Sequence, residues 1–104
     1  MASSRDYLNF ILSQIESLGD VSSRQMMGEY IIYYRGKIIG GIYDNRFLIK
    51  PVQSVVQNIS GKMVEPYCGA KQMFLIDDIE NRDVLCGVVQ KVYDELYNKK
   101  TPKN

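Results

Sequence analysis

Residues 29–50 decide the fold, and their sequence is EYIIYYRGKIIGGIYDNRFLIK. The stretch contains three runs rich in Ile and Tyr, which suit a half-buried pleated surface: Glu29–Arg35, Lys37–Tyr43 and Arg46–Lys50. Arg35-Gly36 and Asp44-Asn45 separate these runs, and Gly, Asn and Asp tolerate the positive φ that two-residue turns require. The stretch therefore predicts an antiparallel meander of three strands, or of four if Ser22–Met27 precedes it as another strand.

Both faces of the run Tyr30–Tyr34 are apolar or aromatic. This pattern predicts a sheet that is covered on one side and contacted on the other, which is a first indication of a partner surface. Gly40 and Gly41 lie inside the next run, where they indicate a bulge or the close approach of another backbone.

Helices are expected before and after the meander. Ser4–Leu18 predicts the first helix, because its apolar residues recur at helical spacing. Ser3 or Ser4 can cap its first turn, and Gly19 suits its end. A short helix is expected over Val52–Ile59.

Two short strands and a last helix complete the predicted order. The strands are expected over Met63–Tyr67 and Lys71–Ile76. The helix is expected over Asp77–Leu96, because apolar residues recur at helical spacing along it and Asp77-x-x-Glu80 has the spacing of a capping box.

The predicted order is thus α-β(3,4)-α-β(2)-α. Segregated strands and helices of this kind indicate an α+β fold of two layers, an antiparallel sheet with helices on one face. The chain has 104 residues, close to the commonest size of one domain. Residues 1–97 are therefore expected to form a single domain, and residues 98–104 a flexible lysine-rich tail.

Composition indicates a globular protein, with 45% hydrophobic and 24% charged residues. Thirteen basic and twelve acidic residues leave a net charge of +1, whereas nucleic-acid binders normally have a clear basic excess. The N-terminus has no signal-peptide pattern, and the longest apolar runs are too short to cross a bilayer. A cytoplasmic location without membrane association is therefore expected.

The chain has no histidine. This excludes Ser-His-Asp and Cys-His nucleophilic sites and histidine metal sites. Cys68 and Cys86 are expected to be free thiols in a reducing compartment, with a disulfide between them as the alternative. A nucleophilic Cys68 would need a nearby cation such as Lys71 to lower its pKa.

One acidic cluster lies at the predicted start of the last helix, and it comprises Asp77, Asp78, Glu80 and Asp83. Such oxygens can hold Mg²⁺ or Ca²⁺, but acids in the first turn also favour the positive end of the helix dipole. The glycines match no phosphate-binding pattern. No cofactor, no metal and no enzymatic activity are therefore expected.

Basic residues lie among aromatic ones in the meander. They are Arg24, Arg35, Lys37, Arg46 and Lys50 among Tyr30, Tyr33, Tyr34, Tyr43 and Phe47. Aromatics beside cations on an open sheet bind single-stranded nucleic acid in several proteins. The alternative is that the tyrosines fill a half-buried sheet while the charges mark its turns and edges.

Several motifs extend over almost the whole chain. They are Arg24-Gln25-Met26-Met27-Gly28-Glu29-Tyr30, Tyr33-Tyr34-x-Gly36-Lys37, Gly40-Gly41, Asp44, Phe47-Leu48-x-Lys50, Pro66-Tyr67-x-Gly69-Ala70 and Asp77-Asp78. Together they resemble the N-terminal domain of the TfoX/Sxy competence-regulator family. The resemblance implies a secretion-chaperone-like fold and a regulatory role, since full-length members promote expression of DNA-uptake genes with other transcription factors. Those members carry a second, C-terminal domain, so this chain resembles a stand-alone copy of the first.

These observations predict an interaction module that binds a protein partner through its aromatic sheet face. The candidate binding residues are Arg24, Met27, Glu29, Tyr30, Tyr33, Lys37 and Lys50. In the alternative interpretation, Met27 and Tyr30 belong to the core, and Arg24 and Glu29 form an ordinary surface ion pair. A homodimer through the tyrosines and nucleic-acid binding at the same face both stay open.

Overall fold

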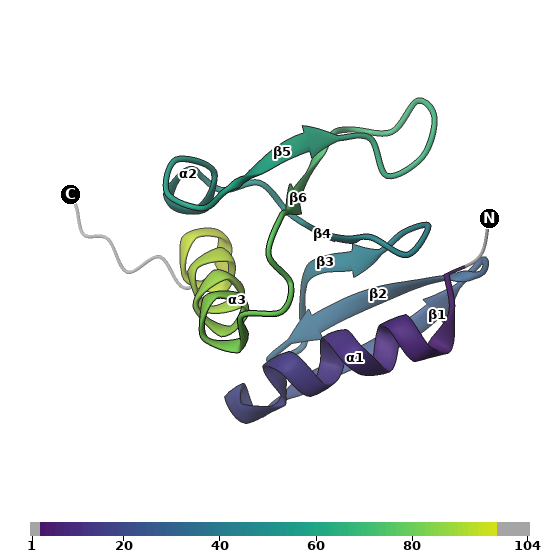
Figure 1. Ribbon diagram of the computed structural model, residues 1–104, viewed down its shortest axis with the longest axis horizontal. Coiled ribbons are helices and arrows are strands. Elements are labelled where there is room, and N and C mark those ends of the chain that lie inside the picture. Colours follow the sequence, from purple (N-terminus) through teal and green to yellow (C-terminus); the bar gives the residue numbers. More distant parts are fainter. Residues whose placement is uncertain (1–2, 98–104) are drawn as a thin grey trace.

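The computed structural model describes residues 3–97 and has an α+β fold, as the sequence predicts. Its elements, in chain order, are α1 (Arg5–Ile15), a 3-10 helix (Glu16–Leu18), β1 (Val21–Met26), β2 (Glu29–Tyr34), β3 (Lys37–Ile42), β4 (Phe47–Ile49), α2 (Gln53–Val56), β5 (Gly61–Val64), β6 (Met73–Ile76) and α3 (Arg82–Tyr97) (Figure 1). The optional fourth strand of the meander therefore forms, as β1.

All six strands belong to one antiparallel sheet with the order β1-β2-β3-β4-β6-β5. Three two-residue turns connect the first four strands, and both residues of each turn have positive φ: Met27-Gly28, Arg35-Gly36 and Asp44-Asn45. The last two turns are those predicted from the sequence. This geometry matches the twist of hairpin strands, so the turns hold the meander in register.

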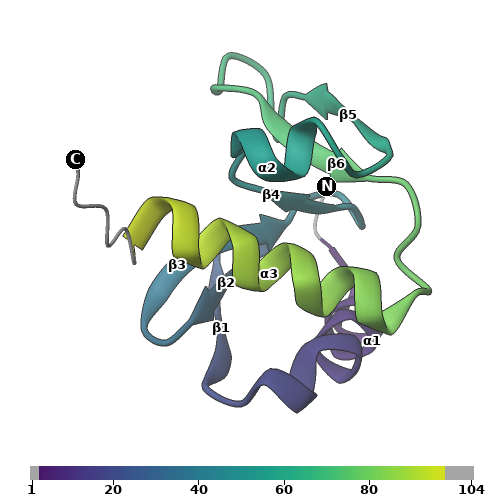
Figure 2. The ribbon, with the colours of Figure 1, turned by 90° about the vertical axis from the view of Figure 1, so that its left-hand side faces the viewer.

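The helices and one face of the sheet enclose a single core, as expected for two layers. Figure 2 shows α2 and α3 in front of the strands, with α1 beside them. The core contains Leu8, Ile11 and Ile15 of α1, Tyr30, Ile32 and Tyr34 of β2, Phe47 and Ile49 of β4, and Leu85, Val88, Val89 and Val92 of α3, among others. Because side chains alternate along a strand, Ile31 and Tyr33 lie on the opposite face of β2.

The Gly40-Gly41 pair lies at an irregular part of the sheet, as predicted. The register between β2 and β3 shifts between Ile32 and Tyr33. A Cβ on Gly40 would lie 2.3 Å from the Leu48 carbonyl oxygen, and a Cβ on Gly41 would lie 2.7 Å from that of Tyr30. Neighbouring backbones therefore come close enough to require glycine at both positions.

The predicted start of the last helix is wrong. Residues 77–80 precede α3, which begins at Arg82. The side chain of Asn81 caps the helix, because its Oδ1 accepts a hydrogen bond from the N–H of Val84 at 3.2 Å. Asp77 instead accepts from the Ser60 hydroxyl at 2.7 Å. The Ile79 carbonyl accepts a hydrogen bond from the Gln14 side chain at 3.0 Å. This bond holds residues 77–80 against α1, outside the last helix.

Other element bounds differ by a few residues. The expected helix Val52–Ile59 is shorter, and the expected strands Met63–Tyr67 and Lys71–Ile76 are β5 and β6 with a loop of residues 65–72 between them. The predicted tail, residues 98–104, lies outside the described residues. Within residues 3–97, no helix is both long and apolar enough to cross a membrane.

Candidate binding groove on the outer sheet face

The sheet face opposite the helices, here called the outer face, carries a row of residues that crosses all six strands. Strand register aligns Arg24, Ile31, Gly41, Leu48, Leu75 and Lys62 in that order. Leu48 is fully buried although it does not belong to the helix-side core. The centre of the outer face is therefore covered, and the residues that surround it form the candidate site.

Two hollows adjoin one another on this face and share Tyr43, Pro66 and Tyr67. The first has a volume of about 710 Å³ and is also lined by Met26, Met27, Glu29 and Ile31. The second, of about 580 Å³, extends to Lys50, Lys71, Met73, Leu96 and Tyr97, among others. Together the two hollows are called the outer groove below.

The two tyrosines at the middle of the groove come from different parts of the chain. The Tyr43 ring lies over Gly41, where a Cβ would be 2.8 Å from it. Tyr67 belongs to the loop of residues 65–72, and its ring centroid is 6.4 Å from that of Tyr43. Tyr67 is 66% exposed, so its ring is available to a ligand.

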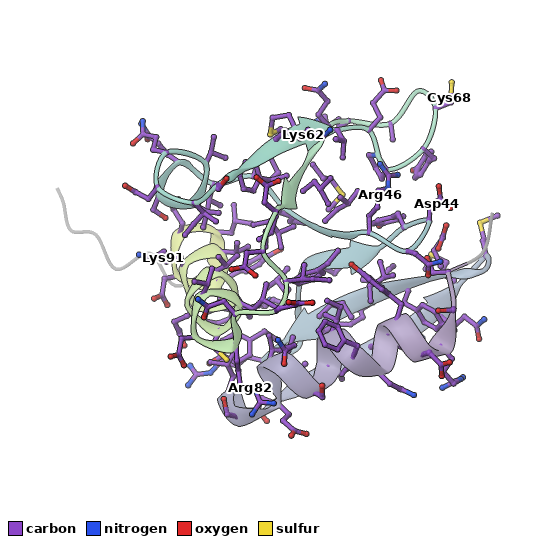
Figure 3. All side chains as sticks on the ribbon, viewed as in Figure 1. Asp44, Arg46, Lys62, Cys68, Arg82 and Lys91 are labelled. Atoms are coloured by element: carbon purple, nitrogen blue, oxygen red, sulfur yellow. The ribbon has the colours of Figure 1, made fainter. Side chains whose placement is uncertain are left out.

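Arg46 attaches this loop to the sheet. Its guanidinium donates to the carbonyls of Tyr43 at 3.1 Å, Glu65 at 3.4 Å and Pro66 at 3.3 Å. Figure 3 shows Arg46 extending from the β3–β4 turn toward the loop that carries Cys68. One side chain thus fixes the distance between the two walls of the groove.

At the other end of the groove, Glu29 connects the start of α1 to the β3–β4 turn. Its carboxylate accepts from the backbone N–H of Ser3 at 3.1 Å, from the Ser3 hydroxyl, and from the N–H of Asp44 at 3.1 Å. Ser3 in turn accepts from the N–H of Asn45 at 3.0 Å. The carboxylate therefore positions the β3–β4 turn beside the start of α1, and it forms no ion pair with Arg24 within residues 3–97.

Three lysines lie at the second hollow or next to it. The Nζ atoms of Lys37 and Lys50 lie 5.9 and 5.8 Å from the centroid of the Tyr97 ring. Lys50 also donates to the Tyr97 hydroxyl at 3.2 Å, and that hydroxyl donates to the Ile38 carbonyl at 2.8 Å. Among residues 3–97, neither these two lysines nor Lys71 has a carboxylate partner, so their charge is not neutralised by the described part of the chain.

Burial raises the pKa of the Tyr43 phenol above its ordinary value, and the nearby Tyr67 and Glu29 raise it further. Tyr43 therefore stays neutral at physiological pH and can donate a hydrogen bond into the groove. Among the described residues, no three Cys, Asp or Glu side chains lie close enough together to hold a metal ion. Cys68 and Cys86 are separate thiols, exposed and half-buried respectively.

The candidate residues named from the sequence have different locations. Met27, Glu29 and Lys50 line the outer groove, and Lys37 lies against Tyr97 at its margin. Arg24 and Tyr33 are on the outer face but do not line the groove.

Tyr30 is a correction to the predicted site. It is 5% exposed and packs in the helix-side core, because it alternates with Ile31 along β2. The alternative interpretation was therefore right for Tyr30. It was wrong for Met27, which is 97% exposed.

Sequence reasoning missed Tyr67 and Tyr97 as groove residues. For Tyr67, the motif Pro66-Tyr67 in the family resemblance was the one sequence feature that indicated a role in the site. Tyr97 gave none, because its position beside Lys37 and Lys50 depends on how the end of α3 packs against β3.

Fold and groove define a small α+β protein with a solvent-accessible site on the outer face of its sheet. No family model matches the chain. It is 32% identical over 80 residues to an uncharacterized 12.7 kDa protein in the trpE 5′ region of Spirochaeta aurantia, a match that covers 76% of this chain and 70% of that protein. The chain belongs to the same family as that protein.

Proposed function

We propose that this protein is a non-enzymatic interaction module that binds an extended, acidic segment of a partner protein in the outer groove. The observation that carries the proposal is the combination of an apolar, aromatic groove with lysines that have no carboxylate partner among residues 3–97.

The apolar part of the groove suits side chains of a partner segment. Met26 is 47% exposed, Met27 is 97% exposed and Tyr67 is 66% exposed, and all three line the same hollow. Isolated exposed apolar residues are ordinary, but a group of them around a concavity is typical of an interaction site. Methionine adapts its shape to different partners, and tyrosine contributes a large rigid contact area.

The charged part of the groove favours an acidic partner. Lys50 and Lys71 line the second hollow, and the Nζ atom of Lys37 lies 5.9 Å from the centroid of the Tyr97 ring. Lys99, Lys100 and Lys103 follow Tyr97 in the sequence. A partner carboxylate near Lys50 would find a cation that is already fixed by Tyr97, so little side-chain entropy would be lost on binding.

A regulatory role is consistent with the resemblance to TfoX/Sxy competence regulators. In this proposal the module acts on transcription indirectly, by binding a transcription factor or another regulatory protein. The absence of histidine from the chain supports a binding function over acid-base or nucleophilic chemistry.

Single-stranded nucleic acid is the second candidate ligand, because tyrosines adjoin lysines along the groove. Bases would stack on Tyr67, while phosphates would contact Lys50 and Lys71. This candidate predicts affinity that falls steeply with salt, since each neutralised phosphate releases counterions.

Peptide-display selection tests the proposal. Wild-type protein is used for capture, and Tyr67→Ser protein is used to remove peptides that bind elsewhere. We expect enriched peptides to combine an aromatic or large aliphatic residue with Asp or Glu, and to bind the wild type at least tenfold more tightly than Tyr67→Ser. No enrichment, or equal binding to both proteins, would reject the proposal. Oligo(U) or oligo(dT) binding that Tyr67→Ser abolishes would select the nucleic-acid candidate instead.

A further inference from the structure

The two edges of the sheet differ in how well they are protected against pairing with another strand. β5, at one edge, has only four residues, carries Lys62 and is soon followed by Pro66. Short edges, lysines and prolines all discourage edge pairing. β1, at the other edge, has six residues with the sequence VSSRQM, and every residue after Val21 is exposed. It contains no proline and one charge.

The backbone of β1 has groups available for pairing along its free edge. Met26 and Glu29 close a two-residue hairpin, and the N–H of Arg35 donates to the Asp20 carbonyl at 2.9 Å. In such a ladder the even-numbered residues of β1 exchange their hydrogen bonds with β2. The N–H and C=O groups of Val21, Ser23 and Gln25 therefore point away from the sheet, and within residues 3–97 they have no backbone partner.

We propose that β1 pairs antiparallel with β1 of a second copy of this chain, about a two-fold axis at Ser23. Ser23 then faces Ser23 of the second copy, and Val21 faces Gln25. Val21, Ser23 and Gln25 are the residues whose backbone groups point to the free edge, and this register places those of one copy opposite those of the other. The pairing gives about six backbone hydrogen bonds. The product is one continuous sheet that extends through both copies, with both outer grooves on the same face.

Charge favours this register over its neighbour. With the axis at Ser23, Arg24 of one copy lies opposite Ser22 of the other, and its two diagonal neighbours there are Asp20 and Arg24, so the two guanidinium groups are diagonal and not directly opposite. A shift of one step would place the axis at Arg24 and put two guanidinium groups directly opposite each other, which destabilises a strand pair. β1 is therefore self-complementary in the register that uses its whole length.

The surface beside the edge also suits a second copy. A hollow between α1 and β1 is lined by Leu12 and Val21 together with polar residues such as Asn9 and Ser13. Leu12 and Val21 are both partly exposed. The added strand would cover this hollow, so pairing removes apolar surface from water in addition to satisfying backbone groups.

The first test compares Ser23→Pro with Ser23→Thr by light scattering coupled to size-exclusion chromatography. The N–H of residue 23 points to the free edge, so proline there removes a donor for the second copy and none for β2. We expect wild type and Ser23→Thr to elute as dimers and Ser23→Pro as a folded monomer, with a far-UV circular dichroism spectrum like that of the wild type and a lower thermal midpoint, because the stabilisation by association is lost. A monomeric wild type, or a Ser23→Pro dimer, would overturn the proposal.

The second test identifies the register in a Cys68→Ser background, which removes the exposed native thiol. Ser23→Cys should form an intermolecular disulfide on mild oxidation, because directly opposite Cα atoms are about 5.5 Å apart. Gln25→Cys is the matched control, since its copies would be about 14 Å apart along the strands. Equal cross-linking of both variants, or cross-linking of Gln25→Cys alone, would contradict a two-fold axis at Ser23. Neither test depends on the outer groove, so the proposed function stands or fails separately.

Discussion

The guanidinium of Arg46 donates to the Pro66 carbonyl at 3.3 Å, and this bond joins the β3–β4 hairpin to the loop of residues 65–72. The same group donates to the Glu65 carbonyl at 3.4 Å. Because Pro66 and Tyr67 line both hollows of the outer groove, Arg46 controls the shape of the groove without lining the two hollows.

Arg46→Met should therefore loosen the loop with little effect on the core. We expect a stability loss of about 1 kcal/mol, the usual contribution of a partly exposed hydrogen-bond group. Amide hydrogen exchange of residues 65–72 should become faster, while that of α3 should stay the same. Arg46→Lys keeps the charge but not the fork of donors, so it should give an intermediate result. Unchanged exchange in the loop would show that Arg46 does not hold it.

Glu29→Ala should destabilise the protein by about 2 kcal/mol, because a charged acceptor of several hydrogen bonds is removed. The loss falls mainly on the Asp44 amide and the Ser3 hydroxyl, because the Ser3 amide keeps the Gly28 carbonyl as an acceptor at 3.1 Å. Urea denaturation measures this change. Glu29→Gln retains one acceptor oxygen and should lose about half as much, and equal stability of all three proteins would contradict the assigned role.

Met27→Asn should stabilise the protein and weaken partner binding. Met27 has φ of 54°, a left-handed conformation that is unfavourable for methionine, whereas Asn before Gly28 is preferred in this type of turn. We expect a gain of roughly 0.5–1 kcal/mol, judged from the usual cost of a left-handed residue. Binding of a selected peptide should weaken, because the exposed methionine is lost from the groove. Tighter binding would indicate that Met27 is only a strained turn residue.

Stability should fall at alkaline pH through Tyr43. Burial raises the pKa of Tyr43 in the folded state, so the unfolded state loses this proton first as pH rises. The stabilisation is complete below the unfolded pKa of about 10 and is lost as pH rises through the higher folded value. Tyr43→Phe should make the thermal midpoint less dependent on pH above 10. Burial also raises the pKa of Tyr7, so Tyr7→Phe should add to the effect, and a wild-type midpoint that does not change above pH 10 would contradict both assignments.

The strand meander could be predicted because local chemistry specifies it. Arg35-Gly36 and Asp44-Asn45 both adopt the positive φ that their residue types indicated, and the Ile- and Tyr-rich runs between them became strands. The start of α3 could not be predicted in this way. Asp77-x-x-Glu80 satisfies the local pattern of a cap, but contacts from Ser60 to Asp77 and from Gln14 to Ile79 hold the segment outside the helix.

The candidate site was predictable only in the part that the meander and its turns provide. Met27, Glu29 and Lys50 lie near the meander and line the groove. Tyr30 was misplaced because both faces of β2 are apolar, so composition does not tell which face the helices cover. Tyr67 and Tyr97 reach the groove from distant segments, and their contribution depends on tertiary contacts such as those of Arg46 and Lys50.

The methionine methyl groups offer the most direct measurement of groove binding. Met26, Met27 and Met73 line the outer groove, whereas Met63 pairs with Phe74 and faces the helix side of the sheet. A peptide from the display selection is added to protein with ¹³C-labelled methionine methyl groups, and the resonances are followed by NMR. We predict shifts for Met26, Met27 and Met73 that Tyr67→Ser abolishes, with Met63 unchanged. Shifts confined to Met63, or none in the three groove methionines, would contradict binding in the outer groove.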